Sequence, residues 1–383
     1  MIENKKIKLA IGATSLVNPL TGIGQYTLNL AKQLSTDNKF DLDYFYGFYW
    51  SKTLKIEDTI ATSALKSWIR KNIPYSYKIR RGVQKKAFNS ANLKDFDLYH
   101  EPNFLPLSYE CKTVVTIHDL SYIRHPHAHP IERVRIMNEL LPEAIEKSNC
   151  IIADSEFTKQ EIISEFSLDA LKIKVVPLGK SAEFYPRLEI ELEDTLTKYG
   201  LKFGQYTLTV GTLEPRKNIT QVIKAYQNLP HSFAIQFPLV VVGVRGWKES
   251  NLLKELDKLI SQNKAFVLGF VSDEDLPKLY SGARTFVFPS IYEGFGLPPL
   301  EAMASGIPVI TSNTSSIPEV VGKSGLMFDI GDVETLSKQI MQVSESNVEF
   351  ARLSQAGLLQ ARHFTWKETA QLTSNAYDYA LEN

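Results

Sequence analysis

The chain has 383 residues, 44% hydrophobic and 22% charged, a composition that excludes a disordered or fibrous protein. This length allows two domains that each bury a core of their own. Lysine plus arginine equals aspartate plus glutamate at 43 each, so no overall charge favours nucleic acid as a partner. The only two cysteines, Cys111 and Cys150, lie in apolar stretches, which favours a reducing compartment, with the cytoplasm as the default.

Neither apolar run of note resembles a membrane anchor. The N-terminal run LAIGATSLV continues into a polar loop instead of a small-residue cleavage site. The central run FPLVVVGV is too short to span a bilayer. We therefore expect a protein that is soluble or that sits on a membrane surface.

Short apolar runs alternate with amphipathic stretches in the first half of the chain, which is typical of a parallel α/β sheet. We predict strands over residues 6–13, 113–119 and 149–155, a loop at 21–24, and helices over 25–34 and 158–166. The sheet-facing side of the first helix would consist of Ile23, Thr27, Leu30, Ala31 and Leu34. Ser155 or Thr158 would cap the second helix.

The second half has the same alternation. It predicts strands over residues 206–212, 237–244, 265–270, 284–290, 307–312 and 325–330. A helix after the first of these carries Ile219, Val222, Ile223 and Tyr226 at helical spacing. Pro177, Gly179 and Pro186 mark a hinge between the two series. The predicted domains are residues 1–180, completed by a C-terminal helix at 364–383, and residues 187–363.

Residues that directly follow strands are the best site candidates, because open parallel sheets bind ligands at the carboxyl ends of their strands. Gly22 and Gly24 follow the first strand, where bare backbone at a helix start can receive a phosphate or simply form a turn. Thr27 holds the third position of the G-x-G-x-x-G pattern, which argues against a dinucleotide cofactor.

Histidines follow another strand. His118 and Asp119 end the strand at 113–119, where the histidine can donate to a phosphate or a sugar hydroxyl, or serve as a structural hydrogen-bonding group. His125, His127 and His129 alternate with prolines and have no acidic or cysteine partner, which makes a poor metal cage.

Arg216 and Lys217 lie between the strand at 206–212 and the next helix. Two cations at a helix start predict an anion site, since arginine can hold two phosphate oxygens at once. The alternative is a solvated loop in which Glu214 forms a salt bridge.

The stretch YEGFGLPPLEA places Glu293 in a loop after a strand and Glu301 in a helix started by Pro298 and Pro299. We expect Glu301 to lie in the first helical turn, where the helix dipole favours the ionised carboxylate. A glycosidase's acid and nucleophile could be such a pair. Two separate acceptors on one longer ligand fit the strand-end position better.

Nine basic residues and no acidic one occur between Thr59 and Lys94. Aromatic and aliphatic residues alternate with these cations, a composition suited to an anionic membrane or a lipid diphosphate acceptor, or to a solvated helical face. The residues of this basic patch that we single out are Trp68, Arg70, Lys71, Arg80, Arg81, Lys85 and Lys86.

Six stretches occur in the order found in one known family: TGIGQY, HDLSYIRHP, IIADSEFTKQEI, VGTLEPRKNI, the E-x7-E loop and SGIPVI. Together they resemble the retaining glycosyltransferases of family 4. That resemblance covers most of the chain and implies the GT-B fold, an α/β architecture of two Rossmann-like doubly wound parallel-sheet domains facing a cleft. HDLSYIRHPHAHP and EPRKN look most like bacterial mannosyltransferases of lipopolysaccharide, including O-antigen, or exopolysaccharide assembly.

The resemblance implies a nucleotide diphosphate sugar donor, with GDP-mannose as the first choice, held mainly by the second domain. Arg216 and Lys217 would clamp the diphosphate, and His118 would face the transferring sugar. Glu293 would accept from sugar hydroxyls and Glu301 from ribose hydroxyls. The remaining donor contacts would come from Gly22, Gly24, Gly294, Phe295, Gly296, Leu297, Asn313 and Thr314.

By the same resemblance, the enzyme would be a hexosyltransferase that retains configuration and needs no metal or other cofactor. Its acceptor would be a glycan or a polyprenyl-diphosphate-linked glycan. Separately, the composition of the basic patch leads us to expect peripheral association at the inner face of the cytoplasmic membrane. A UDP- or dTDP-sugar donor and a non-catalytic nucleotide-sugar-binding subunit remain as alternatives. A GT-B epimerase or a phosphorylase-like enzyme ranks below these.

Overall fold

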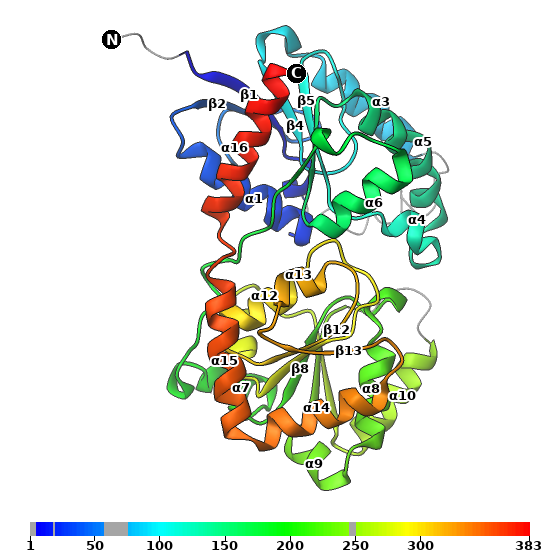
Figure 1. Ribbon diagram of the computed structural model, residues 1–383, viewed down its shortest axis with the longest axis vertical. Coiled ribbons are helices and arrows are strands. Elements are labelled where there is room, and N and C mark those ends of the chain that lie inside the picture. Colours follow the sequence, from blue (N-terminus) through cyan, green and yellow to red (C-terminus); the bar gives the residue numbers. More distant parts are fainter. Residues whose placement is uncertain (1–4, 18–19, 57–75, 245–249) are drawn as a thin grey trace. The chain divides into compact units, whose positions relative to one another are not determined.

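The computed structural model describes residues 5–17, 20–56, 76–244 and 250–383. The chain forms two compact units, coloured along the sequence in Figure 1. The first consists of Met1–Ile123, Ile131–Gly179 and Trp366–Asn383, and the second of Arg124–Pro130 and Lys180–Thr365. The short segment 124–130 therefore groups with the second unit although its neighbours in the sequence belong to the first.

The first unit contains a seven-stranded sheet in the order β3-β2-β1-β4-β5-β6-β7. All neighbouring strands are parallel except β2 and β3. The strands are β1 Ile7–Gly12, β2 Phe40–Phe45, β3 Trp50–Ser51, β4 Leu98–Glu101, β5 Lys112–Ile117, β6 Cys150–Ala153 and β7 Ile173–Val175. The sequence predicted β1, β5 and β6 but missed the other four.

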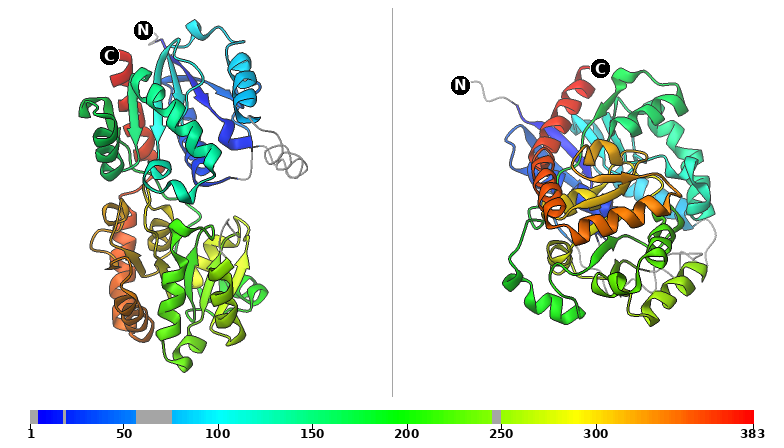
Figure 2. Two further views of the ribbon diagram at one scale, coloured as in Figure 1. Left: turned by 90° about the vertical axis from the view of Figure 1, so that its right-hand side faces the viewer. Right: turned by 60° about the horizontal axis from the view of Figure 1, so that its bottom comes forward.

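Helices cover both faces of this sheet (Figure 2). They are α1 Gly22–Ser35, α3 Ser76–Phe88, α4 Ser121–Arg124, α5 Ile131–Lys147, α6 Glu156–Phe166 and α16 Trp366–Glu382. The Ser155 side chain caps α6 by accepting from the Thr158 N–H, as one of the two predicted caps. The predicted loop at 21–24 is wrong, because α1 already begins at Gly22.

The second unit contains six parallel strands in the order β10-β9-β8-β11-β12-β13, all of them predicted. The strands are β8 Thr207–Val210, β9 Leu239–Val242, β10 Ala265–Gly269, β11 Thr285–Phe288, β12 Val309–Ser312 and β13 Leu326–Phe328. The helices are α7 Glu193–Tyr199, α8 Ile219–Asn228, α9 His231–Gln236, α10 Ser250–Ser261, α11 Leu276–Gly282, α12 Leu297–Ala304, α13 Ile317–Val321, α14 Val333–Glu345 and α15 Asn347–Ala361.

Helix α8 shows how the sequence pattern sets the packing of the second unit. Its predicted face, Ile219, Val222, Ile223 and Tyr226, is at most 2% exposed and joins one apolar core with β9 and α14. Each such aliphatic side chain stabilises the fold by roughly 1.5–3 kcal/mol when fully buried. This packing fixes the start of α8, and with it the loop that precedes the helix.

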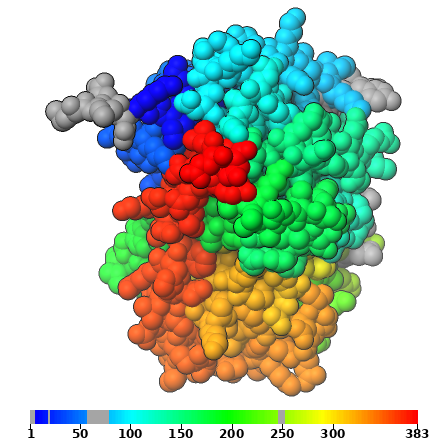
Figure 3. Space-filling model, turned by 45° about the horizontal axis from the view of Figure 1, so that its top comes forward, coloured from blue at the N-terminus to red at the C-terminus, as the bar shows by residue number. Residues whose placement is uncertain are grey.

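The chain returns to the first unit through its last helix, α16, which packs against α1, β5 and β6. Figure 3 shows this helix, in red, on the surface beside the blue and cyan parts of that unit. The Tyr377 hydroxyl on α16 lies 2.7 Å from Nδ1 of the buried His100. Where the chain enters the second unit at Lys180 and leaves it after Thr365, the Lys180 N–H donates to the Phe364 carbonyl oxygen at 3.1 Å.

Both sheets have a switch point, where consecutive connections turn to opposite sides. It lies between β1 and β4 in the first unit and between β8 and β11 in the second. Across the described residues, no helix combines the length and hydropathy that crossing a bilayer requires.

Candidate active site

Three loops meet at the switch point of the second unit. They follow β8, β11 and β12, which are neighbours in the sheet and parallel, so their carboxyl ends lie at one edge. The first loop carries Arg216 and Lys217, the second Glu293, and the third Ser315 and Ser316. The fold therefore brings together residues that are up to 100 positions apart in the sequence.

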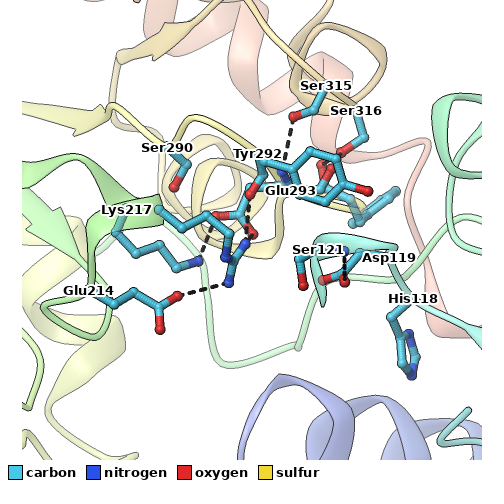
Figure 4. Close-up of polar contacts among 12 residues, drawn as sticks. His118, Asp119, Ser121, Glu214, Lys217, Ser290, Tyr292, Glu293, Ser315 and Ser316 are labelled. Carbon is cyan, nitrogen blue, oxygen red and sulfur yellow. Dashed lines mark hydrogen bonds and ion pairs between the residues drawn. The ribbon is translucent and has the colours of Figure 1, made fainter. Parts of the chain in front are cut away.

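Both cations of the first loop bind the carboxylate of the second. Figure 4 labels Lys217, Glu214 and Glu293 of this cluster. Arg216 Nη1 donates to Glu293 Oε2 at 3.0 Å and to the Tyr292 carbonyl oxygen at 2.6 Å. Its Nη2 donates to Glu214 Oε1 at 3.0 Å. Lys217 Nζ donates to Glu293 Oε1 at 2.6 Å. The predicted Glu214 salt bridge exists, but the arginine and lysine side chains are only 13% and 15% exposed, so this is no solvated loop.

The charges of this cluster control the protonation of Glu293. Burial raises the pKa of its carboxyl, but the adjacent Arg216 and Lys217 charges outweigh burial and lower the pKa to about 2. Glu293 is therefore ionised at neutral pH and cannot act as a proton donor. It holds the two cationic groups in one place, where their positive charges can attract an anionic ligand.

Two serines hold the Glu293 loop in position, and the sequence did not single them out. Ser315 Oγ accepts from the Glu293 N–H at 3.0 Å. The Ser316 hydroxyl lies 2.8 Å from the Glu293 carbonyl oxygen and 2.7 Å from that of Phe295, as donor to either. Ser315 has a φ of 54°, a left-handed conformation that is unfavourable for a non-glycine residue. The only sequence signal for them is their place after a predicted strand.

Helix α12 begins at Leu297, after Gly296, whose φ of 130° favours glycine at this turn. Glu301 is consequently the fifth helical residue, and its expected place in the first turn is wrong. The expected ionised state is also wrong. Burial raises the pKa of Glu301 to about 8, since the Tyr280 hydroxyl lowers it less than burial raises it. Near pH 7 the carboxyl is mostly protonated.

The other donor residues predicted for the second unit lie around the same loops. Phe295 is buried, and its ring packs on Phe364 with the two ring centroids 5.7 Å apart. It therefore offers the site only its backbone. Gly294 and Gly296 are also buried, and Leu297 is half-buried. Asn313 is exposed and Thr314 half-buried directly after β12.

The remaining predicted residues belong to the first unit. His118 follows β5 and is buried, with Nδ1 2.7 Å from Asp154 Oδ2 and Nε2 2.9 Å from the Pro102 carbonyl oxygen. A carbonyl oxygen only accepts, so Nε2 carries a proton. Burial lowers the pKa of His118, but the Asp154 carboxylate outweighs it and raises the pKa overall.

Gly22 and Gly24 lie in the first turn of α1 in the same unit. The first intrahelical bond there runs from the Gln25 N–H to the Thr21 carbonyl oxygen, so the N–H groups of residues 22–24 precede the helical ladder. A side chain at Gly24 would come within 3.0 Å of Leu20 and 3.2 Å of the Ser15 carbonyl oxygen. A larger residue at that position would therefore have to displace these neighbours by a few tenths of an ångström.

Part of the basic patch lies on α3. Arg80, Lys85 and Lys86 are exposed, whereas Arg81 is half-buried and donates to the carbonyl oxygens of Leu105 and Pro106. Trp68, Arg70 and Lys71 lie outside the described residues. Nowhere in the described ranges do three or more His, Cys, Asp or Glu side chains gather in a way that could hold a metal ion.

Comparison with known proteins finds glycosyltransferases over nearly the whole chain, in agreement with the resemblance seen in the sequence. The family model described as Glycosyltransferase Family 4 matches residues 20–183, and that of the glycosyl transferases group 1 matches residues 200–359. The O-antigen chain mannosyltransferase B of Escherichia coli is 37% identical over 97% of this chain and 99% of its own. The serotype-specific mannosyltransferase WbdA of Escherichia coli is 31% identical over 71% of this chain but only 34% of its own length.

Among solved structures, HepE from Anabaena in complex with UDP and glucose has a TM-score of 0.72 at 19% identity, covering 96% of this chain and 98% of its own. This likeness shows the GT-B fold that the sequence predicted. The chain belongs to the family 4 glycosyltransferases, retaining enzymes built from two Rossmann-like parallel-sheet domains. It is a hexosyltransferase.

Proposed function

We propose that this enzyme transfers mannose from GDP-mannose to a glycan or polyprenyl-diphosphate-linked glycan during the assembly of a surface polysaccharide such as O-antigen. Its similarity over nearly full length to an O-antigen chain mannosyltransferase supports the sugar and the pathway class. The observation that carries the reaction type is the convergence of Arg216 and Lys217 on Glu293, within 3.0 Å, at the switch point of the second sheet.

The reaction needs cations at this place because of where charge develops. Breaking the bond between the anomeric carbon and the diphosphate oxygen leaves negative charge on the diphosphate and positive charge on the sugar ring. Arg216 and Lys217 then interact most strongly in the transition state, which is the condition for raising the rate. The acceptor oxygen bonds to the anomeric carbon on the face that the diphosphate leaves, its proton passes to the leaving diphosphate, and the configuration is retained.

The same two side chains can replace a metal ion. Arginine and lysine together supply two positive charges and several N–H donors to one diphosphate. We propose that transfer proceeds without a metal and without another cofactor. Activity that survives EDTA would support this, and activity restored only by Mg²⁺ or Mn²⁺ would contradict it.

The donor can be tested before the acceptor is known. Thermal unfolding in the presence of GDP, UDP and dTDP should show the largest rise in melting temperature with GDP. A shift with UDP or dTDP and none with GDP would favour the alternative donors. A shift with GDP but no mannose transfer to any glycan or polyprenyl-diphosphate-linked glycan would favour a non-catalytic binding subunit.

Variants of the cluster separate binding from chemistry. Arg216→Ala or Lys217→Ala should slow transfer by about 10²- to 10³-fold, since each removes a contact to the leaving group. Glu301→Ala should chiefly weaken donor binding, because Glu301 is proposed to bind the ribose. Wild-type turnover in all three variants would remove this site assignment.

We further propose that α3 associates with the inner face of the cytoplasmic membrane. The helix exposes Arg80, Lys85 and Lys86 beside Ile79 and Val83, whose exposures are 62% and 51%. Exposed aliphatic side chains among cations suit an anionic lipid surface. Arg81 is not part of this surface, because its guanidinium binds the backbone near residue 105.

Vesicles of phosphatidylcholine with phosphatidylglycerol test this association. The double variant Lys85→Glu, Lys86→Glu should lose salt-sensitive binding to these vesicles. The matched control is Lys258→Glu, Lys338→Glu, two exposed helical lysines of the second unit. Equal binding of both variants would contradict the membrane role of α3.

A further inference from the structure

A short segment from the first half of the sequence lies against the Glu293 loop, between β11 and α12, which we call the donor loop. Residues 124–130 group with the second unit, and within them the His125 ring contacts the Tyr292 ring, with centroids 5.1 Å apart and planes tilted by 58°. Tyr292 directly precedes Glu293 and is only 4% exposed. The donor loop is therefore supported by His125, which lies about 170 positions earlier in the sequence.

Backbone and ring contacts fix the His125 side chain. A 3-10 turn at Pro126–Ala128 follows it, and the Ala128 N–H donates to the His125 carbonyl oxygen at 2.9 Å. Ala128 is 1% exposed, which anchors the turn. The His127 ring meets the His125 ring edge-on at 5.9 Å. His125 is therefore held between His127 and Tyr292.

Tyr292 in turn holds Arg216. Its carbonyl oxygen accepts from Arg216 Nη1 at 2.6 Å, and the preceding Ile291 N–H donates to the Arg216 carbonyl oxygen at 2.9 Å. The Tyr292 peptide thus bonds the guanidinium that also binds Glu293. A shift of the Tyr292 ring would move this carbonyl oxygen, and a small misplacement of a group that positions the leaving diphosphate is costly to the rate.

We infer that His125 is a positioning residue, which acts through Tyr292 to hold Arg216 in its productive orientation. This inference rests on the proposed function, because it concerns the same donor site. His125 need not touch the donor, and its ring shape matters more than its charge. Removing the ring should loosen Arg216 without removing any cation.

Steady-state kinetics of His125→Ala and His125→Phe test the inference. Loss of one aromatic contact should lower kcat about threefold to tenfold in His125→Ala. The KM for the donor should change by less than about twofold, since Arg216 acts mainly in the transition state. His125→Phe keeps a ring and should restore most of kcat. His231→Ala, an exposed histidine on α9, is the matched control and should have wild-type kcat.

A double-variant cycle tests whether His125 acts on the rate through Tyr292. Tyr292→Leu removes the partner ring, so His125→Ala should lower kcat no further when combined with it. Additive losses, an unchanged kcat in His125→Ala, or failure of His125→Phe to restore the rate would each overturn the inference. Urea unfolding of every variant shows that the compared proteins are folded at the assay temperature.

The assay uses whichever nucleotide sugar the wild-type enzyme turns over, which separates this inference from the proposed donor. If the wild type prefers a UDP-sugar, the GDP-mannose proposal fails, and the His125 variants are then measured with that UDP-sugar. A fall in kcat that phenylalanine rescues would still support the role of His125.

Discussion

Lys217 Nζ and Glu293 Oε1 are 2.6 Å apart in a site where the other oxygen of the same carboxylate binds Arg216. With Glu214, the cluster contains two cations and two carboxylates, so it is electrically balanced without a ligand. A diphosphate would enter a site whose cations are already in position. Their reorganisation during the reaction is then small, which is how preorganised charges lower a barrier.

Glu293→Gln should destabilise the ligand-free protein by about 3 kcal/mol, because it leaves two partly buried cations with one carboxylate. Urea unfolding measures this loss. Saturating GDP should recover more stability in the variant than in the wild type, since the diphosphate supplies the missing negative charge. Glu349→Gln breaks only a solvent-exposed pair with Arg352, so it should cost little and show no such recovery. Equal behaviour of the two variants would contradict the role of Glu293.

Acid should reveal the same interaction. The folded-state pKa of Glu293 is about 2, below the ordinary value of 4.5, so its ionised form stabilises the fold at every pH above 4.5. That contribution, about 3 kcal/mol, should be lost as pH falls from about 4.5 to about 2. Urea midpoints over this range should fall less steeply for Glu293→Gln than for the wild type. Parallel curves would show that the carboxylate is not stabilised by its neighbours.

Nucleotide binding should release a proton from Glu301. Its pKa of about 8 leaves the carboxyl mostly protonated at pH 7, whereas accepting from two ribose hydroxyls, one at each oxygen, favours the carboxylate. GDP affinity should therefore rise from pH 6 to 8, by up to about tenfold per unit, and level off above pH 8. Calorimetry in buffers of different ionisation enthalpy measures the released proton. Glu301→Gln should abolish the release, and persistence in that variant would assign the proton to another group.

Ser316→Ala should affect both stability and rate. Its hydroxyl donates to the Glu293 loop from inside the protein, and loss of this bond should cost about 1–2 kcal/mol. Because the loop carries Glu293, kcat should fall as well. Ser261→Ala removes an exposed hydroxyl bond at the end of α10 and should leave both quantities near the wild type. An unchanged kcat in Ser316→Ala would show that the serine does not help to position the loop.

The sequence predicted the second sheet better than the first, for a physical reason. Strands such as β9 are continuous apolar runs, buried on both faces. The missed β2, FDLDYF, alternates polar and apolar residues near the sheet edge, and Lys52 neutralises Asp41 and Asp43 there. The missed β4 contains His100 and Glu101, whose polar character hides its complete burial.

At the site, the sequence placed Arg216, Lys217 and Glu293 at strand ends, but it predicted neither the direct bonds of the two cations to Glu293 nor the electrostatics. Arg216, Lys217 and Glu293 follow neighbouring strands, and the spacing of strand ends was enough to bring them together. The ionisation of Glu301 depends on burial, which outweighs the helix dipole five residues into α12. Ser316 and Tyr292 act through bonds to backbone atoms, which leave no trace in the residue pattern.

The hydrogen bond between His100 and Tyr377 joins a residue that is synthesised early to one that is synthesised late. A ribosome completes the second unit before it releases α16, the helix that packs on α1, β5 and β6. The first unit is therefore the first to emerge and the last to be finished, and its partner surface for α16 stays open while some 180 residues are added. Nascent chains halted before residue 366 should contain a folded second unit and an incomplete first unit.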